Sequence, residues 1–287
     1  MPSTKSSWLI LILLSIVWGS SFILIKKALI ALSPMQLASL RLTFAAMAFA
    51  PFFWKESRNV GRREWILLAL VGLAGSGFPA FCYALAQTKI ASSTTGILNS
   101  LTPLFTLLIG IGIFQVKSSW SKWIGVALGL IGAVILIAPT SSQEHASTPY
   151  AAFIILGSIC YAVSGNLIKQ YFPNRSAFSI STLAFTLLGP AALILLLNTN
   201  IVTVIQNDTY AWYSIGAVLL LAIAGTALAS IFYFKLVQDT DALFASSVSY
   251  LIPVVAIILG ALDGEDLHLY HVFGLLLISS GIYLSRR

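Results

Sequence analysis

A group of polar residues lies in the middle of an apolar stretch that is long enough to cross a membrane. Residues 95–110 read TGILNSLTPLFTLLIG and place Asn99, Ser100, Thr102 and Pro103 among leucines and isoleucines. These side chains are neutral, so they offer hydrogen bonds rather than acid, base or nucleophilic chemistry. Because Pro103 removes a helical N–H donor, the carbonyl of Asn99 loses its usual partner. A neighbouring hydroxyl, a water molecule or a bound solute must then satisfy this carbonyl.

The same design returns in residues 245–260, which read ASSVSYLIPVVAIILG. Ser249 lies four positions before Pro253, so this proline frees the carbonyl of Ser249. We interpret the two stretches as matched, locally weakened helices that face each other across a transport pathway. Pro103 and Pro253 are the predicted points at which the helices kink or gate the pathway.

Polar residues recur on one face of each stretch, and such a face must turn away from lipid to keep its hydrogen bonds. These residues are Ser92, Thr95, Asn99 and Thr102 in the predicted span that contains the first stretch, and Ser246 and Ser249 in the second stretch. We expect Thr95, Asn99, Ser246 and Ser249 to line a substrate site. The alternative is that they only join helices to one another.

Five aromatic residues are further candidates for the site: Trp18, Tyr83, Tyr161, Phe234 and Tyr250. Tyrosine and tryptophan offer an apolar plane with one polar atom, which suits planar or amphipathic solutes. Ordinary core packing is the alternative for each of them.

Arg41 is the charged residue that interrupts an apolar run, while no Asp or Glu falls within any run. Its side chain either extends to the membrane surface or projects into the cavity, where it would bind a carboxylate. The lack of a carboxylate inside the runs gives no support to proton coupling through a buried acid.

The composition indicates a membrane protein with many spans. Hydrophobic residues make up 58% and charged residues 9% of the 287 residues, whereas soluble domains are about 25% charged. In such a chain Lys and Arg residues set the orientation of the spans in the membrane, so we do not read the net charge of +7 as a sign of nucleic-acid binding, and we expect no nucleic-acid partner. The expected partners are the lipid bilayer and a small-molecule substrate, and we expect the protein to be a monomer or homodimer.

Ten runs of about 20 apolar residues predict ten transmembrane helices. They are Ser6–Lys26, Pro34–Trp54, Trp65–Gln87, Ser92–Val116, Trp120–Ala138, Pro149–Lys169, Phe178–Leu197, Trp212–Lys235, Ala242–Leu262 and Leu267–Leu284. The links between them are short and polar, so the fold class is an all-α membrane protein without a soluble domain.

Basic residues distribute unevenly between the two sides of this arrangement. One side collects Lys5, Lys55, Arg58, Arg62, Arg63, Lys117, Lys122, Lys169, Arg175, Lys235, Arg286 and Arg287, and the other has Lys26, Lys27 and Lys89. Because Lys and Arg are retained on the cytoplasmic side, this split predicts that both termini are cytoplasmic.

Collinear matches between the two halves predict an internal repeat. Leu24-Ile25-Lys26 matches Leu167-Ile168-Lys169, Gln87 matches Gln238, Pro103 matches Pro253, and Gly110, Gly125 and Gly132 match Gly260, Gly274 and Gly281. A unit of five spans is odd, so its second copy begins on the opposite face and the repeats are inverted. We expect residues 1–140 to hold helices 1–5 and residues 141–287 to hold helices 6–10.

Short motifs add a resemblance to a known family. They are WGSSF at 18–22, Arg41, NSLTPLF at 99–105 and YLIPV at 250–254. With the ten-span pattern, the whole chain resembles the drug/metabolite transporter superfamily, specifically bacterial permeases built from two EamA domains. The resemblance implies a metabolite carrier, often an exporter of amino acids, with a cavity lined mainly by spans 1, 3, 4, 6, 8 and 9.

The resulting expectation is a secondary transporter that exports small organic metabolites such as amino acids across the bacterial cytoplasmic membrane by alternating access. Efflux of hydrophobic drugs is the first alternative. Carriage of organic phosphates or nucleotide sugars is less favoured because a phosphate would need several inward cations. A non-transporting scaffold or receptor subunit is an alternative from another class. We expect no enzymatic activity, no cofactor and no metal, because no phosphate loop or metal-ligand spacing occurs.

Overall fold

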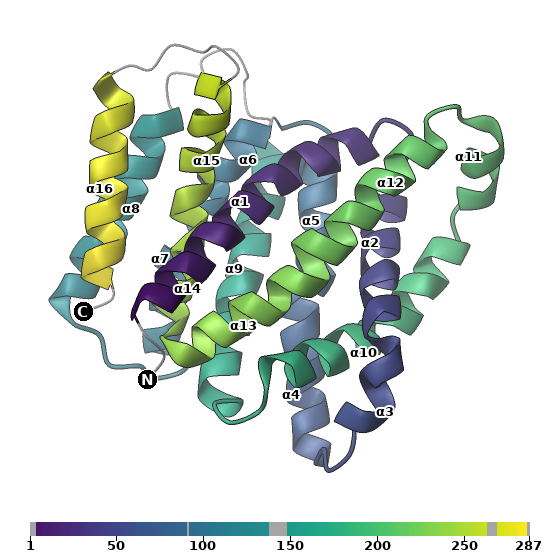
Figure 1. Cartoon of the computed structure of the whole chain (residues 1–287), viewed down its shortest axis with the longest axis horizontal. Helices are drawn as coiled ribbons and strands as arrows, with labels where there is room; N and C mark the ends of the chain where they lie inside the picture. The colour runs from purple at the N-terminus through teal and green to yellow at the C-terminus, as the bar shows by residue number, and fades with distance from the viewer. Residues whose placement is uncertain (1–3, 91, 138–147, 263–268, 286–287) are drawn as a thin grey trace.

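The computed structural model describes residues 4–90, 92–137, 148–262 and 269–285, and these residues form a bundle of helices (Figure 1). The first half contains α1 (Thr4–Ala28), α2 (Pro34–Phe49), α3 (Phe53–Glu56), α4 (Arg62–Gly72), α5 (Phe78–Ala86), α6 (Ser92–Asn99), α7 (Thr102–Gly112) and α8 (Trp120–Ile137). The second half contains α9 (Thr148–Tyr171), α10 (Ala177–Leu197), α11 (Ile201–Asn207), α12 (Ala211–Ala222), α13 (Ala229–Asp239), α14 (Ala242–Ser246), α15 (Val248–Leu262) and α16 (Leu269–Ser285). A 3₁₀ turn, η1 (Ala50–Phe52), joins α2 to α3.

The helices have the length and composition of membrane spans. Within the described residues, six are long and apolar enough to cross a bilayer: Lys5–Ala28, Pro34–Glu56, Arg62–Ala86, Pro149–Tyr171, Ala177–Leu197 and Ala211–Asp239. Four shorter apolar helices are Thr102–Gly112, Trp120–Ile135, Ala242–Val255 and Phe273–Ser285. The predicted class, an all-α membrane protein, is confirmed, while the count of ten spans stays a prediction.

The second span of each predicted repeat begins in the same way. Ser33 caps α2 by accepting a hydrogen bond from Gln36 N at 3.3 Å, and Ser176 caps α10 by accepting one from Ser179 N at 3.1 Å. Each cap satisfies a backbone N–H at the start of its helix. In Figure 1, α2 runs downward and α10 runs upward, which is the antiparallel relation that inverted repeats require.

The third and eighth spans each contain a π-helical segment near their middle. These are η2 (Leu73–Gly77), between α4 and α5, and η4 (Ile223–Leu228), between α12 and α13. Because a π turn shifts the hydrogen-bond register, carbonyls lose their regular partners, and such turns are frequent at functional sites. Thr226 Oγ1 donates to Leu221 O, five residues earlier, at 3.0 Å. The two segments thus interrupt corresponding spans at corresponding depths.

The spans that contain the two prolines are also interrupted. α6 ends at Asn99 and α7 begins at Thr102, so Pro103 stands in a first helical turn, where its missing N–H is tolerated. Thr102 Oγ1 donates to Asn99 O at 2.7 Å, and Ser100 Oγ shares its one proton between Gly96 O at 3.0 Å and Ser249 O at 3.2 Å. Hydroxyl groups therefore satisfy both of the carbonyls that the prolines free, and the bond to Ser249 O joins the two interrupted spans.

A tight pair of helices, α8 and α16, stands at one edge of the bundle (Figure 1). Their backbones approach closely at glycines: a Cβ atom on Gly281 would lie 2.6 Å from Gly125 O, and one on Gly132 would lie 2.8 Å from Gly274 O. The glycines that the sequence pairs as repeat mates thus meet at one interface. Only glycine allows this approach, as at other interfaces between membrane helices.

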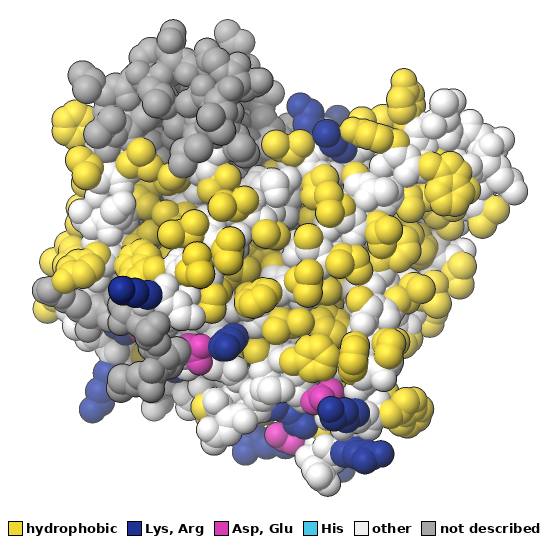
Figure 2. Space-filling model, viewed as in Figure 1, with side chains coloured by type: hydrophobic (Ala, Val, Ile, Leu, Met, Phe, Trp, Pro, Cys, Tyr) yellow, Lys and Arg dark blue, Asp and Glu magenta, His cyan; other side chains and the backbone are white. Residues whose placement is uncertain are grey.

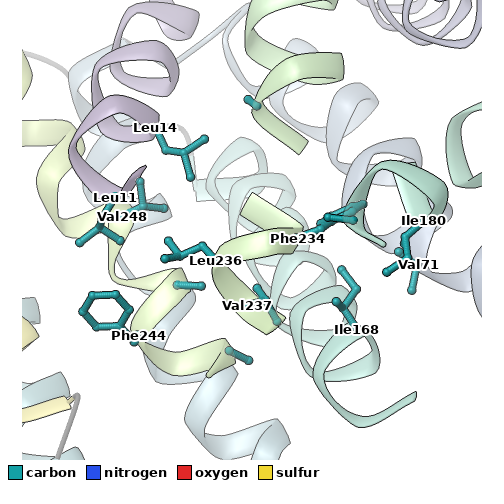
Figure 3. Close-up of a cluster of buried hydrophobic side chains, with 14 of the residues drawn as sticks. Leu11, Leu14, Val71, Ile168, Ile180, Phe234, Leu236, Val237, Phe244 and Val248 are labelled. Atoms are coloured by element: carbon teal, nitrogen blue, oxygen red, sulfur yellow. The ribbon is translucent and has the colours of Figure 1, made fainter. Parts of the chain in front are cut away.

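Buried hydrophobic side chains from both halves pack together in a cluster that includes Leu11, Ile168, Leu236, Val237 and Phe244 (Figure 3). They come from α1, α9, α13 and α14. The start of α1, the end of α13 and α14 lie toward the lower end of the bundle in Figure 1, so this cluster packs the two halves of the chain against each other there.

Lys and Arg side chains gather along the same lower end, near the α3–α4 and α9–α10 connections (Figure 2). We call it the basic end, defined by Lys55, Arg58, Arg62, Arg63, Lys117, Lys122, Lys169, Arg175 and Lys235. The described ends of the chain also lie there (Figure 1).

Candidate functional site

A central cavity of about 90 Å³ lies among α1, α2, α5, α6, α7, α9, α13, α14 and α15. One water molecule needs roughly 10–15 Å³ of such space, so the cavity accommodates several waters or part of a small solute. Its lining consists of Trp18, Ser21, Phe22, Ile25, Arg41, Gly75, Tyr83, Asn99, Thr102, Tyr161, Ser164, Ser230, Tyr233, Phe234, Ser246, Val248, Ser249 and Ile252.

Most of the residues that the sequence analysis selects converge on this cavity. The residues that line it are Trp18, Arg41, Tyr83, Asn99, Tyr161, Phe234, Ser246 and Ser249. Thr95, Tyr250, Pro103 and Pro253 are not among the lining residues. The tertiary fold thus brings together side chains from both halves of the chain.

Tyr250 packs on a neighbouring helix instead of facing the cavity. Its side chain is fully buried, its hydroxyl donates to Val126 O at 3.1 Å, and its ring lies against Gly129 of α8. Ser246, Ser249 and Ile252 follow at intervals of three residues and share the cavity face of this span, so position 250 turns toward α8.

Arg41 projects into the cavity wall rather than to the membrane surface. Its Nε donates to Thr226 Oγ1 at 2.7 Å, and Thr226 belongs to the π-helical segment η4. Among the lining residues, all of which the structure describes, Arg41 is the charged one. The corresponding position of the second repeat holds Ala184, 143 residues later, so this charge belongs to one repeat.

Aromatic rings form much of the remaining wall. Trp18 Nε1 donates to Gly225 O at 2.9 Å, and its ring lies 5.2 Å from that of Tyr233. The rings of Tyr83 and Tyr161 lie 5.8 Å apart. These contacts hold the rings in place, so they present preformed surfaces to a solute.

A chain of hydrogen bonds runs from the cavity toward the basic end. Tyr83 Oη donates to Asn99 Oδ1 at 2.6 Å. Thr102 Oγ1 donates to Asn99 O, Thr106 Oγ1 donates to Thr102 O at 2.8 Å, and Asn166 Nδ2 donates to Thr106 O at 3.1 Å. The interrupted helix is thereby tied to α5 and α9, which fixes the amide of Asn99 at the cavity.

The sequence analysis does not select the lining residues Ser164, Ser230 and Tyr233, or Thr226, which lies behind the lining as the partner of Arg41. Thr226, Ser230 and Phe234 recur at intervals of four, which is a helical face that the sequence does display. For Ser164 no comparable signal exists, because its role depends on α9 lying against α4, where its Oγ donates to Val71 O at 3.1 Å.

A second cavity of about 50 Å³ continues toward the basic end along α7, α9 and α14. Lys122 Nζ, at the start of α8, lies 3.2 Å from Asp241 Oδ2, at the cap of α14, in an ion pair on its wall. Lys169 Nζ donates to Gln238 O at 2.9 Å and to Thr240 O. These contacts hold the α13–α14 turn against α8 and α9 at the basic end.

Replacing Lys169 by methionine is expected to open the basic end more often, because two carbonyls at the end of α13 lose their charged donor. A hydrogen bond to a charged group contributes about 1.5–3 kcal/mol, so opening should become at least about tenfold more frequent. The measurement is the labelling rate of Thr106→Cys, a position only 3% exposed, by a membrane-impermeant thiol reagent in nanodiscs. The background variant replaces Cys82 and Cys160 with alanine.

The repeat mate Lys26 supplies the control. Lys26 is exposed at the opposite end and has no hydrogen-bond partner among the described residues. Lys26→Met should therefore leave the labelling rate of the same cysteine unchanged. Equal rates in the Lys169→Met variant and its parent would contradict the closing role of Lys169.

The protein has helices of membrane-span length around a polar and aromatic cavity. These features place it in the class of polytopic membrane proteins that enclose a solute-sized site. The profile of the EamA-like transporter family matches residues 6–138 and 148–287. The chain belongs to this family, within the drug/metabolite transporter superfamily, and is a small-molecule transporter of the inner membrane. The family places it among transporters rather than enzymes.

Individual relatives are similar over nearly the whole chain. An uncharacterized inner membrane transporter of Escherichia coli (strain K12), YedA, is 26% identical, covering 94% of this chain and 90% of the relative. A probable amino-acid metabolite efflux pump of Salmonella typhimurium is also 26% identical, with coverage of 99% and 95%. An S-adenosylmethionine uptake transporter of Rickettsia prowazekii is 24% identical over 58% of this chain.

A solved crystal structure has the same fold, with a TM-score of 0.71 and 18% identity. The alignment covers 98% of this chain and 96% of that one. Similarity therefore extends across both halves of the chain.

Proposed function

We propose that this chain exports small amino-acid-like metabolites from the cytoplasm by alternating access. The observation that carries the proposal is the guanidinium group of Arg41 in a cavity whose other lining residues are neutral. A single cation in such surroundings favours a ligand that brings one negative charge. Amino acids and their close relatives meet this requirement with a carboxylate.

Thr226 orients Arg41 for this task. Because its hydroxyl accepts the Nε proton of Arg41, the two amino groups of the guanidinium remain available to a ligand. A planar guanidinium binds a carboxylate through two parallel hydrogen bonds, which a lysine cannot reproduce. The aromatic rings of Trp18, Tyr161 and Tyr233 would then receive the apolar part of the solute.

Inverted repeats support the alternating-access part of the proposal. Two halves of opposite orientation can exchange conformations, which opens the central site to each side in turn. We assign residues 1–140 and 141–287 to the two repeats. The excess of Lys and Arg at the basic end supports a cytoplasmic position for that end and for both termini.

Efflux of uncharged hydrophobic compounds is the second candidate, favoured by the aromatic lining of the cavity. Organic phosphates fit less well because a phosphate group would require more than the one cation that Arg41 provides.

Proteoliposome counterflow separates these candidates. Vesicles loaded with a mixture of unlabelled amino acids are expected to accumulate at least one labelled amino acid, whereas labelled nucleotide sugars and an uncharged hydrophobic dye should not accumulate. Comparison of inside-out with right-side-out membrane vesicles tests the outward direction. Accumulation of none of the amino acids would refute the proposed substrate class.

A further inference from the structure

The hydroxyl groups of the central cavity share one hydrogen-bonding state. Each of six lining serines and threonines donates its proton to a backbone carbonyl, at distances between 2.5 and 3.1 Å: Ser21, Thr102, Ser164, Ser230, Ser246 and Ser249. A hydroxyl has one proton and two lone pairs. With the proton committed to the backbone, these oxygens can only accept hydrogen bonds from a solute.

Three of these acceptors belong to the two interrupted spans and line the same cavity. Ser246 closes α14, Ser249 follows three residues later in α15, and Thr102 begins α7. The bond from Ser100 Oγ to Ser249 O holds the two interruptions together. We call Thr102, Ser246 and Ser249 the hydroxyl wall.

The charged donor approaches the cavity from another side. Arg41 belongs to α2, which lies on the opposite side of the bundle from α14 and α15 in Figure 1. The indole N–H of Trp18 is bonded to Gly225 O, and the phenol of Tyr83 is bonded to Asn99 Oδ1. The other donors among the described lining residues are the Asn99 amide and the phenols of Tyr161 and Tyr233. The hydroxyl wall therefore complements a group rich in protons, and Arg41 complements a negative one.

We infer that the hydroxyl wall is an ammonium subsite and that the substrates are zwitterionic α-amino acids rather than carboxylates without an amine. This inference rests on the proposed function, because Arg41 must hold the carboxylate. A protonated amine brings up to three donors, which matches a cluster of oxygens with free lone pairs. Neutral oxygens bind an ammonium group without the strong attraction of a buried carboxylate, so the substrate can leave again.

Competition with counterflow tests the subsite through matched compounds. Each set contains an amino acid, its deaminated analogue and its decarboxylated analogue. If counterflow identifies an aliphatic amino acid as substrate, the set is L-leucine, 4-methylpentanoate and 3-methylbutylamine. If it identifies an aromatic one, the set is L-phenylalanine, 3-phenylpropionate and 2-phenylethylamine. In the unmodified protein the amino acid should inhibit with a constant at least about tenfold lower than that of its deaminated analogue, since each charged hydrogen bond adds affinity.

The double variant Ser246→Ala/Ser249→Ala should lose most of this tenfold preference while it binds the deaminated analogue as tightly as before. An unchanged inhibition constant for the deaminated analogue shows that the variant is folded. Ser246→Thr keeps the hydroxyl and should keep the preference. The matched control is Ser15→Ala, because Ser15 is a buried serine of α1 that also donates to a carbonyl, Ile12 O at 2.7 Å, but does not line the cavity.

Two results would overturn the subsite. One is equal inhibition by the amino acid and its deaminated analogue in the unmodified protein, and the other is an equal loss for both compounds in the double variant. If the double variant does not fold, Ser249→Ala alone must lower the preference at least about threefold, and an unchanged preference would overturn the subsite. Failure of the proposed function has a different outcome, because then no amino acid drives counterflow at all.

Discussion

Replacing Arg41 by glutamine is expected to raise the KM for an amino-acid substrate by about a hundredfold. The substitution removes two charged hydrogen bonds to the carboxylate, each contributing about 1.5–3 kcal/mol. The neutral amide of glutamine can still donate one hydrogen bond and so offsets part of this loss, and the remaining hundredfold change corresponds to about 2.7 kcal/mol. Initial rates of counterflow over a range of substrate concentrations measure the effect. The inhibition constant of the matching decarboxylated amine should not rise, because that compound makes no hydrogen bond to Arg41 and its ammonium group is repelled by the guanidinium.

Two further variants separate binding from folding. Arg41→Lys keeps the charge but lacks the bidentate geometry, so its KM should fall between those of the unmodified protein and Arg41→Gln. Thr226→Val removes the acceptor for Nε and should also raise KM, whereas Thr226→Ser should restore it. Because Arg41 has no acidic partner among the lining residues, its neutralisation should not lower the thermal stability. A loss of stability without a change in KM would show that Arg41 is structural.

Replacing Gly281 by leucine is expected to abolish most of the folded, monodisperse protein. The first added carbon would lie 2.6 Å from both Gly125 O and Gly129 N, and backbone atoms cannot move aside as a side chain would. Helices α8 and α16 would have to separate, which removes their shared interface. Fluorescence-detected size-exclusion chromatography in detergent measures the folded fraction.

Alanine substitutions measure a milder form of the same crowding between α8 and α16. Gly281→Ala adds one carbon that makes the same backbone contact. Overpacking of this kind costs about 1–3 kcal/mol, so the variant should lower Tm by about 5 °C. Gly216→Ala is the control, because a Cβ atom at Gly216 of α12 would meet nothing within 4 Å. Since alanine favours helix more than glycine does, the control should be neutral or slightly more stable. Equal effects at the two positions would mean that the close approach of α8 and α16 is not needed for stability.

Interactions between near neighbours explain what the sequence predicts well. Apolar runs of span length and the effect of each proline on the carbonyl four residues earlier depend on residues close together in the chain. The repeat is visible for the same reason, because spacing along the chain is preserved in both halves.

The direction in which a side chain points is less predictable. Arg41 could reach either the surface or the cavity from the same position, and the hydroxyl of Thr226, 185 residues away, holds it in the cavity. Tyr250 and Ser249 are adjacent, yet one packs on Gly129 and the other lines the cavity. The π turn η4, which carries Thr226, leaves no mark on the hydropathy pattern, because it changes the hydrogen-bond register and not the apolarity.

The sequence by itself determines that this protein is an all-α membrane protein with two related halves, because burial in lipid and backbone hydrogen bonding act locally on apolar runs. Only the tertiary structure decides which polar groups meet in the central cavity and which of their protons are already committed. That outcome depends on contacts between helices far apart in the chain, such as the bond from Ser100 to the carbonyl of Ser249. The chemistry of the site therefore depends on how the helices pack, which cannot be predicted from composition and residue spacing.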